Sequence, residues 1–416
     1  MIRLKQMASD STAQPAATGL SVPPRNYGAF VVFIAIIGAF SSLVNDMYLP
    51  TIPDMMREFH TTPSMTQMGL SMAMAGMGLG SVLWGSASDR YGRKPVLLVS
   101  LVIFAVATAV SLFSRNIVFF IVCRLFQGLG AGGAMVLSTS IPADVYMGRQ
   151  LAKLMAIVGA INGIAPALGP VVGGFMADWV GWRGIFVLLL VIGVGMTFWT
   201  TRYHETLPPS RRLKVKSMAD YLRAYKSLFI NGRFMLYVVI KAVAIGLLYA
   251  YISSAPFIIQ DHYHFSSVDF GLIFGGNALC MGIGSTLALR FKVMKQGMVV
   301  GCVGMFVFAC AEAVVMWVDA PFLYYEISAL PMLLFSGMIF SSANTLSMEE
   351  GRAEAGTASA ILSVVKYVFA AVVSPLVGLG NMLHSTAIAF VVITLIALVL
   401  AWFAWRLAPL ADMVRK

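Results

Sequence analysis

Charged residues are scarce in this sequence. Asp, Glu, Lys and Arg make up 11% of its 416 residues, whereas 59% are apolar and the mean hydropathy is +0.83. A water-soluble domain of this length needs far more charge to cover its surface, so the composition excludes an ordinary soluble protein. The solvent around most of the chain is therefore expected to be lipid.

The short alternating segments of a membrane β-barrel are also missing. The apolar runs are long and unbroken, as in 96–113 and 388–403. A bilayer core needs about 20 apolar residues per helix, so the chain can form roughly 12 spans joined by short turns. Helices satisfy their own backbone hydrogen bonds in hydrocarbon. We therefore predict an all-α polytopic membrane protein with 12 transmembrane helices, at 28–50, 64–85, 96–114, 117–140, 151–176, 184–203, 234–255, 268–289, 298–318, 323–345, 355–380 and 385–405.

Residues and motifs that carry catalysis or bind metals are few. The four Cys lie inside apolar runs, which indicates packing rather than disulfides or metal ligation, and the five His lie at span ends or in loops. Neither Gly-x-Ser-x-Gly nor His-Glu-x-x-His occurs. We expect no enzyme, no metal and no cofactor. A sensor or scaffold that never transports is an alternative, but it leaves the charges inside the spans unexplained.

The net charge of +11 is distributed unevenly along the chain. Of the 29 Lys and Arg, only Arg57, Arg115 and Arg183 lie in turns on one side of the predicted membrane, and three more lie within spans. All the others are on the opposite side. This asymmetry is the positive-inside pattern, which predicts that both termini are cytoplasmic. The basic excess therefore reports topology, and nucleic-acid binding is not expected.

A long basic connection divides the chain into two parts. It covers residues 204–233 and leaves six spans before it, in 28–203, and six after it, in 234–406. Two six-helix bundles of this kind indicate an internal duplication typical of transporters. Within the connection, Met218–Phe229 can form an amphipathic helix on the inner leaflet.

Both chain ends are polar. Residues 1–27 are predicted to be a disordered cytoplasmic tail that stays attached, since no small-residue cleavage site follows the first apolar run. Residues 407–416 are predicted to be a short cytoplasmic tail.

Two ionisable residues lie in predicted spans, where a charge is costly in lipid, so a structural or functional role is expected for each of them. Asp46 lies in the outer third of the first span. It is either a rim residue in water, or a carboxylate that faces a cavity and takes up and releases protons as its exposure alternates. Arg124 lies at a similar depth. It either pairs with Asp46, directly or through water, or is a structural arginine bonded to neighbouring helix backbone.

The roles of other polar residues in spans stay open. Lys241 can reach the inner face with its charge, a structural role is favoured for Glu312, and Glu326 is expected in water at an outer helix end. Lys366 lies nearer mid-span and is a candidate for the cavity. Core packing and ligand contact are equal alternatives for the remaining cavity candidates, which are Asn45, Tyr48, Gln127, Tyr249, Tyr251 and Asn344.

Two glycine-containing runs suggest moving parts. Gly169-Pro170-Val-Val-Gly173-Gly174 forms a bendable, flat helix face that suits two halves rocking against each other. In the turn at 85–95, Asp89 can pair with Arg93 and approach another helix N-terminus, an interaction that would differ between conformational states.

These runs resemble signatures of the major facilitator superfamily, and specifically of its drug:proton antiporters. Gly85-x-x-x-Asp89-Arg-x-Gly-Arg93-Lys matches the superfamily signature, and the run that begins at Arg124 looks like the signature of the fourth helix. The run 169–174 is similar to the antiporter signature. The bicyclomycin-resistance (Bcr/CflA) branch is indicated by similarity in the segments 45–53, 144–146, 205–212 and 355–359.

The resemblance implies roles for these residues. Two six-helix bundles would enclose a cavity lined mainly by helices 1, 4, 7 and 10. Asp46 would be the protonation site and Arg124 its electrostatic modulator. A cytoplasmic latch would be formed by Gly85, Asp89 and Arg93, and the antiporter hinge by Gly169, Pro170, Gly173 and Gly174. The corresponding turn of the second half, 290–297, matches the signature of the turn 85–95 only weakly, so the latch is expected in the first half alone.

The function implied is proton-coupled export of drugs or other small amphiphilic molecules across the bacterial inner membrane. The expected partners are a small-molecule substrate, protons and membrane lipid, with a monomeric chain driven by the proton gradient. The alternative is a transporter of the same superfamily that moves a sugar or metabolite, in either direction. The helix-5 signature weighs against import, and the substrate itself is not readable from the sequence.

Overall fold

The computed structural model describes residues 26–209, 212 and 225–406, and every regular element in those ranges is helical. The long helices are α2 (Tyr27–Asp46), α4 (Pro63–Tyr91), α5 (Arg93–Ser111), α6 (Ile117–Val145), α7 (Gly148–Arg202), α9 (Gly232–Pro256), α10 (Ser267–Leu287), α11 (Met294–Trp317), α12 (Phe322–Glu350), α13 (Ala355–Leu376) and α14 (Met382–Arg406). The short ones are η3 (Leu49–Thr51), α3 (Ile52–Glu58), η5 (Phe257–His262), η6 (Ala288–Arg290) and η7 (Arg352–Glu354). The all-helical prediction is confirmed.

Eleven of the described helical stretches are long and apolar enough to cross a membrane, with α7 counted as one. A straight helix of the 55 residues in α7 would be about 82 Å long, far more than the bilayer core of about 30 Å. Gly181 interrupts it with φ 60° and ψ −172°, so α7 consists of two helices that meet there. The two parts correspond to the predicted spans 151–176 and 184–203.

The first long helix ends earlier than predicted. We expected helix to residue 50, but α2 ends at Asp46 and the chain continues through η3 and α3. Pro50 explains the difference, because its ring clashes with the carbonyl of residue 46 and it lacks the N–H that would bond there. The break sets Asp46 at the end of a helix, where the chain changes direction.

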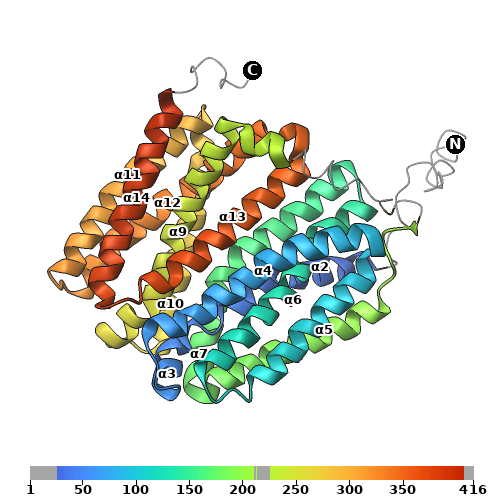
Figure 1. The fold of residues 1–416 in the computed structure, drawn as a ribbon, viewed down its shortest axis with the longest axis horizontal. Coiled ribbons are helices and arrows are strands. Elements are labelled where there is room, and N and C mark those ends of the chain that lie inside the picture. Colours follow the sequence, from blue (N-terminus) through green and yellow to red (C-terminus); the bar gives the residue numbers. More distant parts are fainter. Residues whose placement is uncertain (1–25, 210–211, 213–224, 407–416) are drawn as a thin grey trace, which may run out of the picture.

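The helices form two halves that pack side by side. Figure 1 shows α2 and α4–α6 on one side and α9 with α11–α14 on the other. The halves meet where α4 packs on α13 and α7 packs on α10. Glycine permits the second contact: a Cβ at Gly174 would lie 2.4 Å from the carbonyl oxygen of Ser267, and one at Gly271 would lie 2.5 Å from that of Pro170.

Several sequence predictions fall outside the described residues. The tail 1–27 is described only from residue 26, the tail 407–416 is not described, and most of the predicted helix Met218–Phe229 lies in the gap. Residues 225–230, at the end of that helix, are helical.

Candidate functional site

A cavity of about 570 Å³ lies between the two halves. Its size is that of a site for a small molecule, for which about 300–1,000 Å³ is usual. Most of the lining is apolar or aromatic. Its polar and charged members are Ser41, Ser42, Asn45, Asp46, Asn277, Ser285 and Lys366, and its aromatic members are Tyr249, Tyr251, Phe274, Phe340 and Tyr367.

Asp46 and Lys366 place one acid and one base in this lining, one from each half. Asp46 is buried, with 8% of its surface exposed, and no ion pair joins it to a cation within the described ranges. Lys366 and Arg124 both act on it electrostatically, Lys366 more strongly. The ammonium of Lys366 lies 5.0 Å from the centre of the Tyr367 ring. Burial in the lining favours the cavity position for Asp46 over the rim position.

Arg124 is fully buried behind Asp46 and is held without a direct ion pair to it. Its guanidinium donates to the carbonyl oxygens of Val44 and Gly69, at 3.2 and 3.3 Å. It also donates to the side-chain oxygens of Gln127, at 3.0 Å, and Asn45, at 3.2 Å. The guanidinium thus joins α2, α4 and α6. One of its partners, Asn45, is the residue next to Asp46.

Four of the predicted cavity residues line the cavity: Asn45, Tyr249, Tyr251 and Lys366. The other three serve elsewhere. Tyr48 follows the helix break and packs its ring 4.5 Å from the Arg124 guanidinium carbon. Gln127 accepts from Arg124 and donates to Ser111.

Asn344 accepts a 2.6 Å hydrogen bond from the ammonium of Lys241. That ammonium also lies 4.9 Å from the centre of the Phe340 ring, and Lys241 is buried. The expectation that Lys241 reaches the membrane face is therefore wrong. Phe340 lines the cavity, so this pair lies directly behind the lining.

The sequence analysis missed Asn277 on α10. Its side chain donates to the Tyr251 hydroxyl at 2.7 Å and lines the cavity while only 1% exposed. An amide inside an apolar span is a signal that could have identified it, as it identified the charged residues. Ser41 and Ser42 on α2 were missed as well, because serines are common in membrane helices and carry little signal.

The run 169–174 lies where three elements meet. A Cβ at Gly169 would lie 3.1 Å from the Cβ of Asp46, and one at Gly173 would lie 1.8 Å from the Met47 carbonyl oxygen. Gly174 faces α10 of the other half, as described above. The helix therefore touches both Asp46 and the opposite half, and Pro170 lies inside it.

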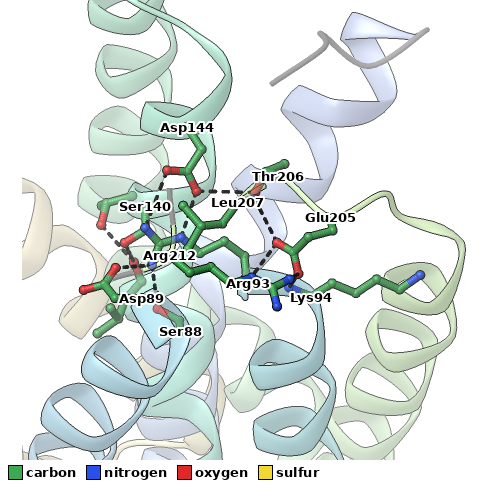
Figure 2. A network of polar contacts seen from close by, with 12 residues as sticks. Ser88, Asp89, Arg93, Lys94, Ser140, Asp144, Glu205, Thr206, Leu207 and Arg212 are labelled. Atoms are coloured by element: carbon green, nitrogen blue, oxygen red, sulfur yellow. Dashed lines mark hydrogen bonds and ion pairs between the residues drawn. The ribbon is translucent and has the colours of Figure 1, made fainter. Parts of the chain in front are cut away.

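The predicted latch is a network of charges around Arg93 (Figure 2). The Arg93 guanidinium donates to Asp89 at 2.6 Å and to Ser88 at 2.7 Å, which confirms the predicted pairing with Asp89. It also donates to Asp144 on α6 at 2.8 Å. Arg93 is 8% exposed, so these bonds are largely shielded from water.

Glu205, after α7, caps the start of α5. Its carboxylate accepts from the backbone N–H groups of Arg93, at 2.9 Å, and Lys94, at 3.2 Å. Asp144 and Glu205 were noted only as parts of similar segments, and their contacts with the latch were not predicted. Gly85 has no side chain that could take part in the network. A Cβ at this position would meet only Val136, at 3.6 Å. Arg93 thus joins α4, α5 and α6 of the first half through Asp89 and Asp144.

The opposite end of the bundle, which we call the α3 end, holds the two halves together. Arg57 on α3 donates to Asp261 on η5 at 2.8 Å. Gln260 donates to the Pro50 carbonyl at 2.9 Å. Deeper in, Gln67 donates to the Ser253 carbonyl, also at 2.9 Å. These contacts cover the cavity from the α3 end.

Known proteins similar to this chain are transporters. A family model described as Major Facilitator Superfamily matches residues 34–375. An uncharacterized MFS-type transporter of Bacillus subtilis, YdgK, is 30% identical over 85% of this chain and 89% of its own length. Multidrug resistance protein D of Escherichia coli is 27% identical over 85% of this chain and 89% of its own length. A bicyclomycin resistance protein homolog of Haemophilus influenzae is 26% identical, with coverages of 83% and 88%.

Solved structures show the same fold at lower identity. A bacterial homologue of the human lysosomal transporter Spinster gives a TM-score of 0.76 at 15% identity, covering 92% of this chain and 98% of that one. The xylose transporter XylE of Escherichia coli, in an inward-open conformation, gives 0.71 at 16% identity, covering 92% and 96%. The family-model match over most of the chain decides the assignment. This chain is a membrane transporter of the major facilitator superfamily.

Proposed function

We propose that the protein exports drugs or other small amphiphilic molecules in exchange for protons. The observation that carries this proposal is the cavity between the halves, where a buried Asp46 is the acidic group and Lys366 faces it from the other half. The names of the relatives, multidrug resistance protein D and bicyclomycin resistance protein homolog, support drugs as the substrate class.

The proposed exchange follows from the cost of a buried charge. An ionised Asp46 in a cavity walled by apolar side chains is costly unless a cation or donor compensates it. Lys366 or a donor group of the substrate can do so, and a proton on Asp46 removes the need. Proton and substrate then compete for one site, so each is released on the side where the other binds.

The hinge and the latch would set the two states. In the described state Arg57, Gln260 and Gln67 join the halves at the α3 end, and Arg93 binds Asp89 and Asp144 of its own half. We propose that rocking at Gly173 and Gly174 opens the α3 end, and that Asp89, which is partly exposed, then contacts the second half.

The proposed topology has twelve spans, with α7 counted as two at Gly181. The Lys and Arg distribution supports an arrangement in which the Arg93 end and both termini face the cytoplasm of a bacterial inner membrane. The α3 end then faces outward. The domains would be the tail 1–27, bundles 28–203 and 234–406, the linker 204–233 and the tail 407–416, in a monomer.

The rival within the superfamily is transport of a sugar or metabolite. The likeness to a xylose transporter concerns the fold alone at 16% identity. The drug proposal is supported by the Phe, Tyr and Met side chains of the lining, which suit an amphiphilic molecule, and by the relatives named for drug resistance.

A proteoliposome assay tests the proposal. Protein in the inside-out orientation is given an inside-acid gradient and external bicyclomycin, a phenicol or a lipophilic organic cation. We expect at least one of these compounds to accumulate inside the vesicles while the gradient is present. This accumulation should be lost when the gradient is collapsed. Equal accumulation with and without the gradient would reject proton antiport.

A further inference from the structure

A second buried acidic site lies in the other half, away from Asp46. Glu312 on α11 is fully buried, and Glu326 on α12 has one carboxylate oxygen, Oε2, that is buried. Ser328, two residues after Glu326, contacts the Glu312 carboxyl group, so the two acids lie close together. Glu312 is five residues before the end of α11 and Glu326 four residues into α12, so both lie about one to two turns inside the α3 end. The expectation that Glu326 stands in water is wrong for that oxygen.

The pair has several acceptors and few donors. Four buried polar atoms have no hydrogen-bond partner: Glu312 Oε1, Glu326 Oε2, the Asn277 side-chain oxygen and the Tyr325 hydroxyl. No Lys or Arg forms an ion pair with either carboxyl group in the described ranges. Two buried carboxylates without a counter-charge are strongly unfavourable in apolar surroundings. A proton on the pair removes one charge and supplies a donor.

Ser328 indicates where such a proton sits. Its hydroxyl contacts Glu312 and also lies 2.8 Å from the carbonyl oxygen of Tyr324. A hydroxyl has only one proton to donate. If that proton goes to Tyr324, as serines in helices often do, the proton between Ser328 and Glu312 belongs to the carboxyl group.

The surroundings of the pair include a group of aromatic rings and two residues of the cavity lining. Tyr263, Phe322 and Tyr325 pack together near the α3 end, with ring centres 5.4 to 5.9 Å apart. On the cavity side, Asn277 donates to Tyr251, while its side-chain oxygen, like Glu326 Oε2, is buried without a partner. Both Asn277 and Tyr251 line the cavity.

The other titratable groups near the pair offer no counter-charge. They are the phenols Tyr251, Tyr263 and Tyr325 and the thiol Cys280, with the ion pair of His262 and Asp319 farther out and His384 of α14 against Trp317. The phenols and the thiol are neutral at physiological pH, and His262 is already paired with Asp319.

We propose that Glu312 and Glu326 form a second proton-binding site, which holds one proton between the two carboxyl groups and exchanges it with the central cavity past Asn277 and Tyr251. The site does not depend on Asp46 being the coupling carboxylate. It adds a proton carrier to the second half, where the proposed function has none.

Infrared spectroscopy of the purified full-length protein tests the site without any substrate. A protonated carboxyl group has a carbonyl stretch above the carboxylate bands. In the Asp46→Asn background, which removes any band from that carboxyl group, we expect such a band at neutral pH, its loss in both Glu312→Gln and Glu326→Gln, and its persistence in the control Glu354→Gln, which alters an exposed glutamate. A band that survives in both pair variants, or is lost in only one, would overturn a shared proton.

Two further variants test the hydrogen bond at the site and the path by which the proton exchanges with the cavity. Ser328→Ala keeps both carboxyl groups and should shift the frequency of the band; an unshifted band would contradict the proposed hydrogen bond. On transfer to heavy water, Asn277→Leu should slow the deuterium shift of the band several-fold, while the control Ser285→Ala, on the same helix and cavity wall, should not. Equal rates in wild type and Asn277→Leu would overturn exchange through the cavity. Gradient-driven transport in wild type is a separate measurement, so its failure would reject the export proposal alone.

Discussion

At the scale of single residues, Arg124 is the most constrained charge in the first half. Its planar guanidinium serves two backbone carbonyls and two side-chain amides that belong to three helices. Lysine keeps the charge but cannot reproduce this fork. The residue is therefore defined by its geometry as much as by its charge.

We predict that Arg124→Lys lowers stability by about 1–3 kcal/mol, because buried acceptors lose their donors. Gradient-driven transport should fall as well, since Asn45, next to Asp46, loses its anchor. Thermal unfolding in detergent and uptake into proteoliposomes measure the two effects. Arg115→Lys, in an exposed turn, is the control. Unchanged stability in Arg124→Lys would mean that the guanidinium contacts are not structural.

Two carboxylates share Arg93 but should differ when neutralised. Asp144 is buried with Arg93, whereas the Asp89 side chain is 39% exposed. Asp144→Asn should cost on the order of 3 kcal/mol, because it leaves the buried Arg93 charge with only the partly exposed Asp89 as its partner. Asp89→Asn should cost below about 1 kcal/mol. Its effect should fall instead on turnover, with substrate binding spared; equal unfolding temperatures for both variants would contradict this ranking.

At the scale of elements, the sequence predicted the long helices well and their ends less well. Hydropathy locates each apolar run, but it did not weigh Pro50, and so the break after Asp46 was missed. By contrast, the predicted spans 151–176 and 184–203 left a turn between them, and Gly181, which divides α7, lies in that turn. Local backbone chemistry decides such boundaries, and an average over a long window hides it.

The close approach of α7 to the end of α2 depends on a missing side chain. A Cβ at Gly173 would lie 1.8 Å from the Met47 carbonyl oxygen, whereas one at Gly163, in the same helix, would meet nothing within 4 Å. Gly173→Ala should therefore destabilise by about 1–3 kcal/mol through overpacking. Gly163→Ala should be neutral or slightly stabilising. Thermal unfolding compares them, and similar behaviour would reject a tight crossing at Gly173.

At the scale of the whole molecule, the halves are joined at the α3 end and the cavity is walled by both. Replacing Arg57 and Asp261 with cysteines, and joining these with a short reducible cross-linker, should stop transport reversibly. Each single cysteine variant is the control, because the native cysteines are buried or partly buried. Full transport in the cross-linked protein would show that the α3 end does not open.

The site could be predicted only in part, for a reason that also belongs to this scale. The cost of charge in lipid singles out Asp46, Arg124 and Lys366 along the chain, whatever their neighbours. It does not show which polar groups face one another. Asn344 therefore turned out to bond Lys241, and Asn277 lines the cavity although it carries no charge.

The account depends most on Asp46 as the proton carrier. Asp46→Asn removes the titratable group and keeps the size of the side chain. In proteoliposomes it should abolish gradient-driven accumulation of a drug that wild type accumulates. It should still exchange that drug across the membrane when no gradient is present, because the cavity and the hinge remain. Gradient-driven accumulation at the wild-type rate in Asp46→Asn would contradict the account.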